Sequence, residues 1–345
     1  MNPFASYRAI NTKISAKKRT LLPKKDWEKL AGSHDVMQII DYLKKREGYK
    51  PAFATCKVAE IHRSDLEIIL DRFCVGEIED MLHYFSGSYK VFFSTFLMEY
   101  EILDLNHILR AIARQEKIPN IEEQFVHSEK WSKVDYKKLL AARNVTQFIE
   151  GLKGTCYYNA LKTLAQDDLS KREFHMEMKL YLLYYSLLNE RMSRLDKKDQ
   201  EVAKHFIGTK VDFLNAQWIY RAIKYYDLTP EEILIYSIPY GSKLNYRRLK
   251  QLSYVKNMEE CKKLIEKYLA YPLFKDNNDA FLDCMSDRYL YKFIVKMDKD
   301  DETIASSLAY ISILGIETND LISLTEGVRY ALPTNELSKY LVHTI

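Results

Sequence analysis

Glycine and proline are scarce in this sequence. They number 10 and 8 among 345 residues, about 5% together, against roughly 12% in average proteins. Sheets and long loops depend on turns built from these two residues. Their scarcity therefore argues against a β-rich fold and predicts an all-α protein, and a hydrophobic content of 47% is enough for a large core.

Long apolar runs and paired cysteines are also missing. The longest apolar runs, such as 180–188 and 308–316, have nine residues, whereas a membrane-spanning helix needs about 20. We therefore expect no segment that crosses a bilayer. The five cysteines are scattered without a CxxC pair, and the first residues contain no apolar signal-peptide core. These features predict reduced thiols in a cytoplasmic compartment.

Motifs for catalysis and cofactor binding are absent from the sequence. It contains no GxxxxGK[ST] or GxGxxG loop, no GxSxG elbow and no HExxH, and its eight histidines show no metal-ligand spacing. We expect no catalytic residues, no cofactor and no metal. The net charge of +4 is close to balance, so we also expect no nucleic-acid partner.

One local excess of basic residues lies near the start of the chain. Asp26 and Glu28 are the only acids between Arg8 and Lys29. The basic residues there are Arg8, Lys13, Lys17, Lys18, Arg19, Lys24, Lys25 and Lys29. Two interpretations stay open: the solvated face of an amphipathic helix, or a face turned toward acidic lipid or an acidic partner.

A pattern of polar residues recurs three times within apolar helical stretches. It consists of one acid, a polar residue three positions later and a charged residue nine positions after the first. The three copies are Glu101, Asp104 and Arg110; Asp212, Asn215 and Arg221; and Glu317, Asp320 and Glu326, at offsets of 111 and 105 residues. A proline follows each copy, at Pro119, Pro230 and Pro333.

Each copy is preceded by a related front end. The stretch DWEKLAGSHDVMQIIDYL from Asp26 aligns without gaps with DYKKLLAARNVTQFIEGL from Asp135, and a third copy from Asn245 needs three inserted residues. The chain is therefore divided into a lead-in with module 1 (1–120), module 2 (121–235) and module 3 (236–345). A period near 110 residues predicts a small helical bundle per module, and we favour a closed, pseudo-threefold arrangement over an open row.

Local signals locate some of the helices within the modules. Thr229, Pro230 and Glu232 have the spacing of an N-cap, a first-turn proline and a capping-box acid, which predicts a helix start. Apolar spacing predicts further helices over 71–90 and 161–190.

The first acid of each copy lies in the middle of the apolar stripe of its helix. For Glu317, the stripe includes Leu321, Leu324 and Val328, because a helix turns about 100° per residue. A carboxylate drawn into a helix interface requires a partner. Three interpretations are open: escape to water at a helix end, an interior contact that caps or pairs with a neighbouring helix, or catalysis.

The other two residues of each copy take different positions on the helix. Asp104, Asn215 and Asp320 fall at the edge of the stripe. Arg110, Arg221 and Glu326 fall on the opposite face, where a partner surface is one possibility. All nine residues are candidates for structural or interface roles.

The repeats and two end segments resemble a known family. The front carries Tyr7, Asn11, Lys13 and the Leu21-Leu22 pair, and the end carries IASSLAYISILGIETNDLISLTEGVRYALPTNELSKYL from Ile304. Together they resemble the C subunit of archaeal and bacterial V/A-type ATPases, called the d subunit in eukaryotic V-type pumps. Tyr225-Tyr226-Asp227 depart from the family, which often has glycine there.

The resemblance implies a funnel-shaped, all-helical body of three related modules. Such a protein is peripheral to the membrane on its cytoplasmic side, because it sits on the proteolipid ring of the rotor. It receives central shaft subunits of the D/F type and passes torque between ATP hydrolysis or synthesis and ion transport, without catalytic residues of its own. A cytosolic three-module scaffold that binds other proteins would show the same patterns, and a helical enzyme is a third possibility.

Overall fold

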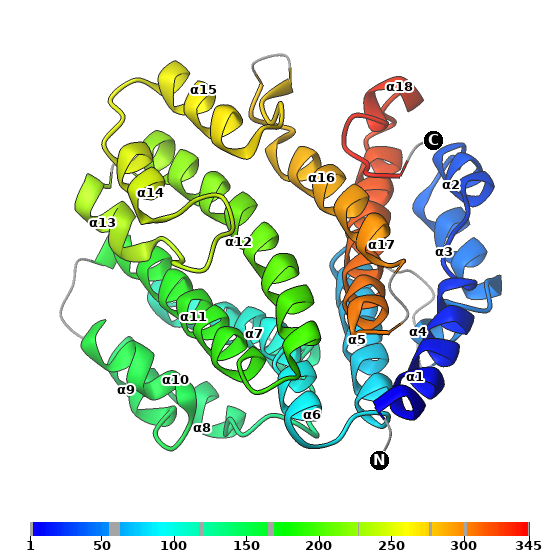
Figure 1. Cartoon of the computed structure of the whole chain (residues 1–345), viewed down its shortest axis with the longest axis horizontal. Helices are drawn as coiled ribbons and strands as arrows, with labels where there is room; N and C mark the ends of the chain where they lie inside the picture. The colour runs from blue at the N-terminus through cyan, green and yellow to red at the C-terminus, as the bar shows by residue number, and fades with distance from the viewer. Residues whose placement is uncertain are drawn as a thin grey trace. The chain divides into compact units, whose positions relative to one another are not determined.

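The described part of the chain forms helices and their connections. The computed structural model describes residues 3–54, 63–116, 120–164, 169–226, 228–275, 278–299, 302–343 and 345. No strand occurs within these ranges (Figure 1), so the prediction of an all-α protein is confirmed. Within the same ranges, no helix is both long enough and apolar enough to cross a membrane.

The chain divides into two compact units. The first combines Met1–Cys74 with Asp196–Ile345, and the second is Val75–Leu195. The first unit thus joins the beginning of the chain to its last 150 residues. These units do not follow the sequence repeat, and the division into modules at 1–120, 121–235 and 236–345 stays a prediction.

The first unit is organised around the long helix α17. This helix packs against α1, α2, α3, α12 and α16, while α12 also packs against α14 and α15. The helices of this unit are α1 (Pro3–Lys18), α2 (Lys24–Ala31), α3 (Val36–Lys45), α4 (Lys50–Phe53), the first half of α5 (Arg63–Leu82), α12 (Lys197–Tyr225), α13 (Pro230–Tyr236), α14 (Tyr246–Ser253), α15 (Met258–Leu269), α16 (Leu282–Met297), α17 (Ala305–Arg329) and α18 (Thr334–Leu337).

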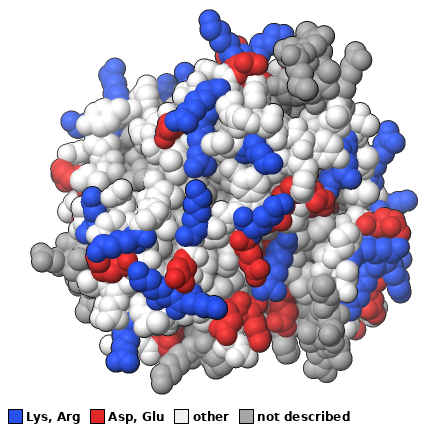
Figure 2. Space-filling view, turned by 90° about the horizontal axis from the view of Figure 1, so that it is seen from below, with Lys and Arg blue, Asp and Glu red and all other residues white. Residues whose placement is uncertain are grey.

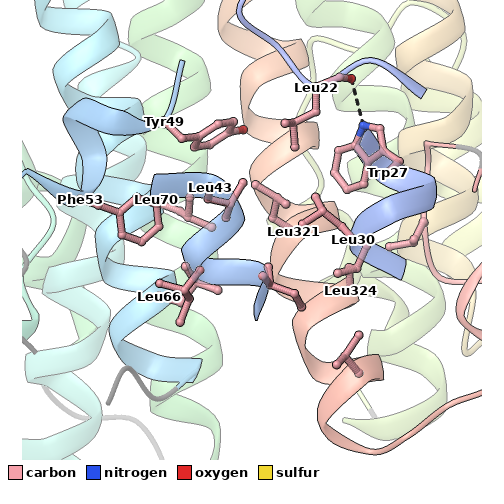
Figure 3. Close-up of a cluster of buried hydrophobic side chains, with 14 of the residues drawn as sticks. Leu22, Trp27, Leu30, Leu43, Tyr49, Phe53, Leu66, Leu70, Leu321 and Leu324 are labelled. Carbon is pink, nitrogen blue, oxygen red and sulfur yellow. Dashed lines mark hydrogen bonds between the residues drawn. The ribbon is translucent and has the colours of Figure 1, made fainter. Parts of the chain in front are cut away.

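A hydrophobic cluster in the first unit joins the two ends of the sequence. Figure 3 shows Trp27 and Leu30 of α2 facing Leu321 and Leu324 of α17. All four side chains are at most 1% exposed. Burial of side chains of this size stabilises a fold by about 1.5–3 kcal/mol each, so the front end of the chain is held firmly on the closing helix.

The second unit is organised around α7 and α11, which pack against each other. Helices α6 and α9 also contact α7, and α10 contacts both α9 and α11. The helices of this unit are the second half of α5, α6 (Gly87–Ser94), α7 (Leu97–Arg114), the short 3₁₀ helix η1 (Ile121–Gln124), α8 (Tyr136–Leu140), α9 (Val145–Gly151), α10 (Cys156–Leu161), the 3₁₀ helix η2 (Lys162–Leu164) and α11 (Leu169–Met192).

Side-chain caps fix several helix starts. Asp35, Asn144 and Asn257 begin α3, α9 and α15, and each accepts a hydrogen bond from a backbone N–H in the first turn of its helix. Such caps satisfy donors that have no partner within the helix. Thr229 and Glu232 form the predicted capping box at the start of α13, so that prediction is confirmed.

Two predicted helices have different limits in the structure. The helix expected over 71–90 is interrupted, because α5 ends at Leu82 and α6 begins at Gly87. Ser86 is extended and Gly87 has a φ of 55°, a left-handed backbone that glycine adopts without strain and that apolar spacing does not reveal. The second, expected over 161–190, corresponds to the end of α10, η2 and α11, which reaches Met192; residues 165–168 lie outside the described ranges.

Candidate functional site

The candidate site consists of three joints, each made by one of the repeated acids. The first joint lies in the second unit, on α7. Glu101 is 8% exposed. Its Oε1 accepts a hydrogen bond from the Ser132 hydroxyl and its Oε2 accepts one from the Tyr157 hydroxyl. These donors come from the segment just before α8 and from α10, so the carboxylate ties α7 to the front end of the following module.

Asp104 completes the first joint three residues further along α7. Its carboxylate accepts hydrogen bonds from the backbone N–H groups of Val126 and His127, at 3.0 and 2.8 Å. The His127 ring contacts the same carboxylate through Nδ1 at 2.8 Å. That ring stacks on Tyr136 at the start of α8, with centroids 3.8 Å apart. The aspartate therefore positions a histidine against the next module.

The second joint lies in the first unit, on α12. Asp212 is 1% exposed and accepts hydrogen bonds from the backbone N–H groups of Lys243 and Leu244, both at 2.7 Å. A Cβ at Gly241 would lie 2.4 Å from Oδ1 of Asp212, so glycine is required for this close approach. Asn215 donates to the carbonyl of Ile238 and accepts from its N–H, each at 2.8 Å. The segment leading to α14 is thereby fixed on α12.

The third joint, on α17, connects the two ends of the sequence. Glu317 is 1% exposed. It accepts hydrogen bonds from the Leu22 backbone N–H at 3.1 Å and from the Tyr49 hydroxyl at 2.7 Å. Figure 3 shows Leu22 and Tyr49 on the front segment beside α17. Glu317 of α17 therefore holds the segment that contains Leu22 and Tyr49.

Asp320 holds the C-terminal segment beside the same joint. It accepts from the backbone N–H groups of Val342 and His343, at 2.9 and 2.7 Å, and contacts the His343 Nδ1 at 2.7 Å. The His343 ring stacks on Trp27, with centroids 4.5 Å apart. This arrangement repeats the one at Asp104 and His127.

The three joints share one chemistry. In each, a carboxylate in the middle of a long helix accepts hydrogen bonds from a segment that leads into the next front end. The carboxylates of Glu101, Asp212 and Glu317 are buried, and they do not reach water at a helix end. This is the geometry that the interior-contact interpretation requires. The contribution of each joint to stability stays a prediction.

Burial raises the pKa of two of the acids. Burial raises the pKa of Glu317 to about 7, against the opposing effects of the Tyr49 hydroxyl, the charge of His343 and the Leu22 N–H. Burial likewise raises the pKa of Asp212, and the N–H groups of Leu244 and Lys243 oppose it. The hydrogen bonds therefore offset only part of the cost of removing these charges from water.

The third residue of each copy lies on the opposite helix face, as its spacing predicts. Arg110 forms an ion pair with Glu177 of α11 at 3.3 Å. Arg221 donates to both oxygens of Asp283 in α16, at 2.9 and 2.7 Å. Glu326 is half-buried and lies 3.4 Å from Arg329 of its own helix. The two arginines thus contact neighbouring helices within this chain.

Sequence reasoning missed the histidine and aromatic members of the joints. His127 and His343 each follow a valine and lie 216 residues apart, the same distance as Asp104 and Asp320. A search at this offset would have found them. In the second joint Ile238 occupies the histidine position, and Asn215 replaces the aspartate. The side-chain amide of Asn215 forms hydrogen bonds with both the carbonyl and the N–H of Ile238. A histidine side chain is therefore not needed to hold this segment.

The basic segment at the start of the chain divides into two groups. Lys18 is 20% exposed and forms an ion pair with Asp298, and its ammonium also donates to the Ser306 hydroxyl at 2.9 Å. Lys13, Arg19 and Lys25 are exposed. The side chain of Arg8 lies outside the described residues. Part of this segment therefore serves the fold, and only part is available to a partner.

Charges of both signs occur together on the surface. Figure 2 shows basic and acidic side chains next to each other across the face that it draws. Among the described residues, no group of three or more histidine, cysteine, aspartate or glutamate side chains has the geometry of a metal site. In the described residues, the contacts of the repeated acids are hydrogen bonds to backbone N–H groups and to hydroxyl groups.

Comparison with known proteins agrees with this picture. A family described as ATP synthase (C/AC39) subunit matches residues 10–340. The C subunit of the A-type ATP synthase from Archaeoglobus fulgidus is 24% identical over 265 residues, which cover 74% of this chain and 73% of that protein. The corresponding proteins of Methanosarcina acetivorans and Methanosphaera stadtmanae are 24% and 27% identical, over 75% of this chain and 70% and 65% of their own lengths.

Proposed function

Because the chain belongs to the ATP synthase (C/AC39) subunit family, we propose that it is a non-catalytic central-stalk subunit of a V/A-type rotary ATPase. In this role it connects the shaft, made of D/F-type subunits, to the proteolipid ring in the membrane. It turns with the rotor and passes torque between ATP hydrolysis or synthesis and ion transport. It is peripheral to the membrane, on the cytoplasmic side, and its contact with the membrane runs through the ring.

The observation that carries this proposal is the family match over residues 10–340, which spans the three repeats. The third joint gives physical support. Modules 1 and 2, and modules 2 and 3, are consecutive in the chain. Modules 3 and 1 are not consecutive in the chain. Their connection is non-covalent: Glu317 accepts a hydrogen bond from Leu22, and His343 stacks on Trp27. A body that transmits torque needs this connection, because an open row of modules would separate under load.

The joints also explain why a rotor protein would keep buried acids. A carboxylate that accepts two or more hydrogen bonds fixes the direction of the segment it holds. Replacing it with an apolar residue would leave buried N–H groups without acceptors, at about 1–3 kcal/mol each. We infer that the repeated acids are retained to hold each front end in one orientation.

Co-purification from membranes tests the proposal. The tagged full-length chain, expressed in its own host, should fractionate with membranes and bring down shaft and ring subunits in fixed stoichiometry. Recovery in the soluble fraction with neither partner would contradict the rotor proposal and favour the cytosolic scaffold.

A charge-reversal variant tests which surface meets the ring. Lys13, Arg19 and Lys25 are exposed, and we expect their replacement by glutamate to loosen membrane attachment most at low salt, since charges are screened over about 10 Å at 0.1 M salt. The matched control reverses three exposed lysines elsewhere in the same unit, Lys204, Lys263 and Lys267. If both variants attach to membranes equally well, the basic segment faces solvent and does not contact the ring.

A further inference from the structure

A pocket lies over the first joint, within the second unit. Its volume is about 400 Å³, within the range of small-molecule sites. It is formed by α6, α7, the segment before α8, the start of α10, and α11. Its lining includes Val91, Leu97, Met98, Glu101, Trp131, Lys133, Cys156 and Arg191.

The pocket is located where a long helix is bent. Helices α12 and α17 run unbroken past their acids, but the corresponding stretch before Glu101 is divided into α6 and α7. The hydroxyls of Ser94 and Thr95 both donate to the Val91 carbonyl, at 2.9 and 3.0 Å, and such back-bonding bends helices. Arg191 of α11 donates to the Thr95 hydroxyl at 2.7 Å. The bend and the arginine are therefore built into this copy of the repeat.

The polar groups left over in the pocket are hydrogen-bond donors. Arg191 uses Nη1 for its contacts with Thr95 and the Val91 carbonyl, which leaves Nε and Nη2. Lys133 is exposed at the rim and forms no ion pair within the described residues. A ligand that fits these groups supplies acceptors.

The carboxylate that lines the pocket is already engaged. Both oxygens of Glu101 accept hydroxyl groups, from Ser132 and Tyr157. The pocket lining thus contains two cations, Lys133 and Arg191, and one carboxylate, Glu101. A third cation, the Lys90 ammonium, lies 5.6 Å from the centroid of the Trp131 ring. The balance of charge favours an anion.

We propose that this pocket binds a small organic anion, with a carboxylate or phosphate head near Lys133 and Arg191 and an apolar body against Leu97 and Met98. The head is the kind of group that guanidinium and ammonium donors bind strongly. The apolar part of the lining includes Leu97, Met98 and the Trp131 ring. Nothing in the proposed rotor function requires this ligand.

Calorimetric titration of the full-length protein provides the first test. Benzoate and phenyl phosphate are the anionic probes, and benzyl alcohol is the neutral control of similar size. We expect saturable binding of at least one anion, at least tenfold tighter than benzyl alcohol. If only one anion binds, that result identifies the head group. Equal or absent binding of all three would overturn the proposal.

Two variants with a matched control locate the site. Arg191→Gln removes the guanidinium that lines the pocket, and we expect it to weaken anion binding about tenfold. Lys133→Gln should weaken binding about threefold, and less at high salt. Lys130→Gln, on an exposed residue of the same segment that is not part of the lining, should bind like wild type. Wild-type affinity in Arg191→Gln and Lys133→Gln would exclude this pocket.

Thiol labelling gives a readout that does not depend on affinity. Cys156 is exposed and lines the pocket, so a bound anion should slow its reaction with a maleimide severalfold. Cys284, half-buried in the other unit, should react at an unchanged rate. If a probe binds at saturation but the labelling rate of Cys156 does not change, the probe binds elsewhere, and that result would contradict the proposal.

Discussion

The imidazole of His343 lies flat on the indole of Trp27, with ring centroids 4.5 Å apart and an interplanar angle of 9°. One ring belongs to the last residues of the chain and the other to its first front-end helix. His127 and Tyr136 form the same stack in the second unit, at 3.8 Å and 5°. In both pairs the histidine is held by an aspartate of the preceding long helix. The contact of His343 with Trp27 and Asp320 thus has the same arrangement as the contact of His127 with Tyr136 and Asp104.

Removing the His343 ring should weaken the third joint. His343→Ala loses an aromatic contact worth about 0.5–1.5 kcal/mol and a hydrogen bond to a charged group worth about 1.5–3 kcal/mol. We expect the free energy of unfolding in urea to fall by about 2 kcal/mol. His34→Ala, at an exposed position, is the control and should change it by less than about 0.5 kcal/mol. Equal stability of the two variants would show that the stack is incidental.

Replacing one of the repeated acids should leave buried donors without a partner. In Asp212→Ala these are the N–H groups of Lys243 and Leu244, and we expect a loss of about 1–3 kcal/mol for each. Glu101→Ala and Glu317→Ala should also destabilise. Arg221→Gln removes an exposed ion pair with Asp283 and should cost at most about 1 kcal/mol. If all three alanine variants unfold within about 0.5 kcal/mol of wild type, the acids are not structural.

The raised pKa of Glu317 predicts a specific pH dependence. Its carboxyl has an ordinary pKa of 4.5 and a folded pKa of about 7, so between these values the native state binds more protons than the unfolded state. Stability contributed by this group therefore falls as the pH rises through that window, by up to roughly 3 kcal/mol.

Urea unfolding at several pH values from 5 to 8 measures this effect. Glu317→Gln should flatten the profile relative to wild type. Burial, together with Asp283 and Asp320, also raises the pKa of Asp287 to about 7, so Asp287→Asn separates the second contribution. A wild-type slope that survives in Glu317→Gln would mean that the carboxyl stays charged throughout this range.

Gly241 should be intolerant of a side chain. A Cβ there would lie 2.4 Å from Oδ1 of Asp212, so Gly241→Ala must displace the carboxylate that holds the second joint, and overpacking of this kind costs about 1–3 kcal/mol. Gly76→Ala is the matched control, because it lies within α5 with no atom within 4 Å of the added carbon. The control should gain about 0.5–1 kcal/mol. Thermal unfolding of the two variants should therefore shift in opposite directions.

The nine repeated polar residues could be found from spacing, but their partners could not. The alignment placed Glu101, Asp212 and Glu317 in equivalent positions, and the helical wheel placed each within an apolar stripe. The donors to Glu317 come from residues 295 and 268 positions away, at Leu22 and Tyr49. No local pattern connects residues so distant, because their approach depends on how whole helices pack.

The sequence by itself determined the helical class, the threefold repeat and the family, because composition, spacing and periodic apolar residues are local properties of the chain. Only the tertiary structure decided that α17 receives the front end of the chain, that Lys18 serves the fold while Arg19 faces solvent, and that α6 and α7 are separate helices. Each of these features depends on which groups become desolvated when segments distant in the sequence pack against each other. The free energy of that desolvation is a property of the assembled core.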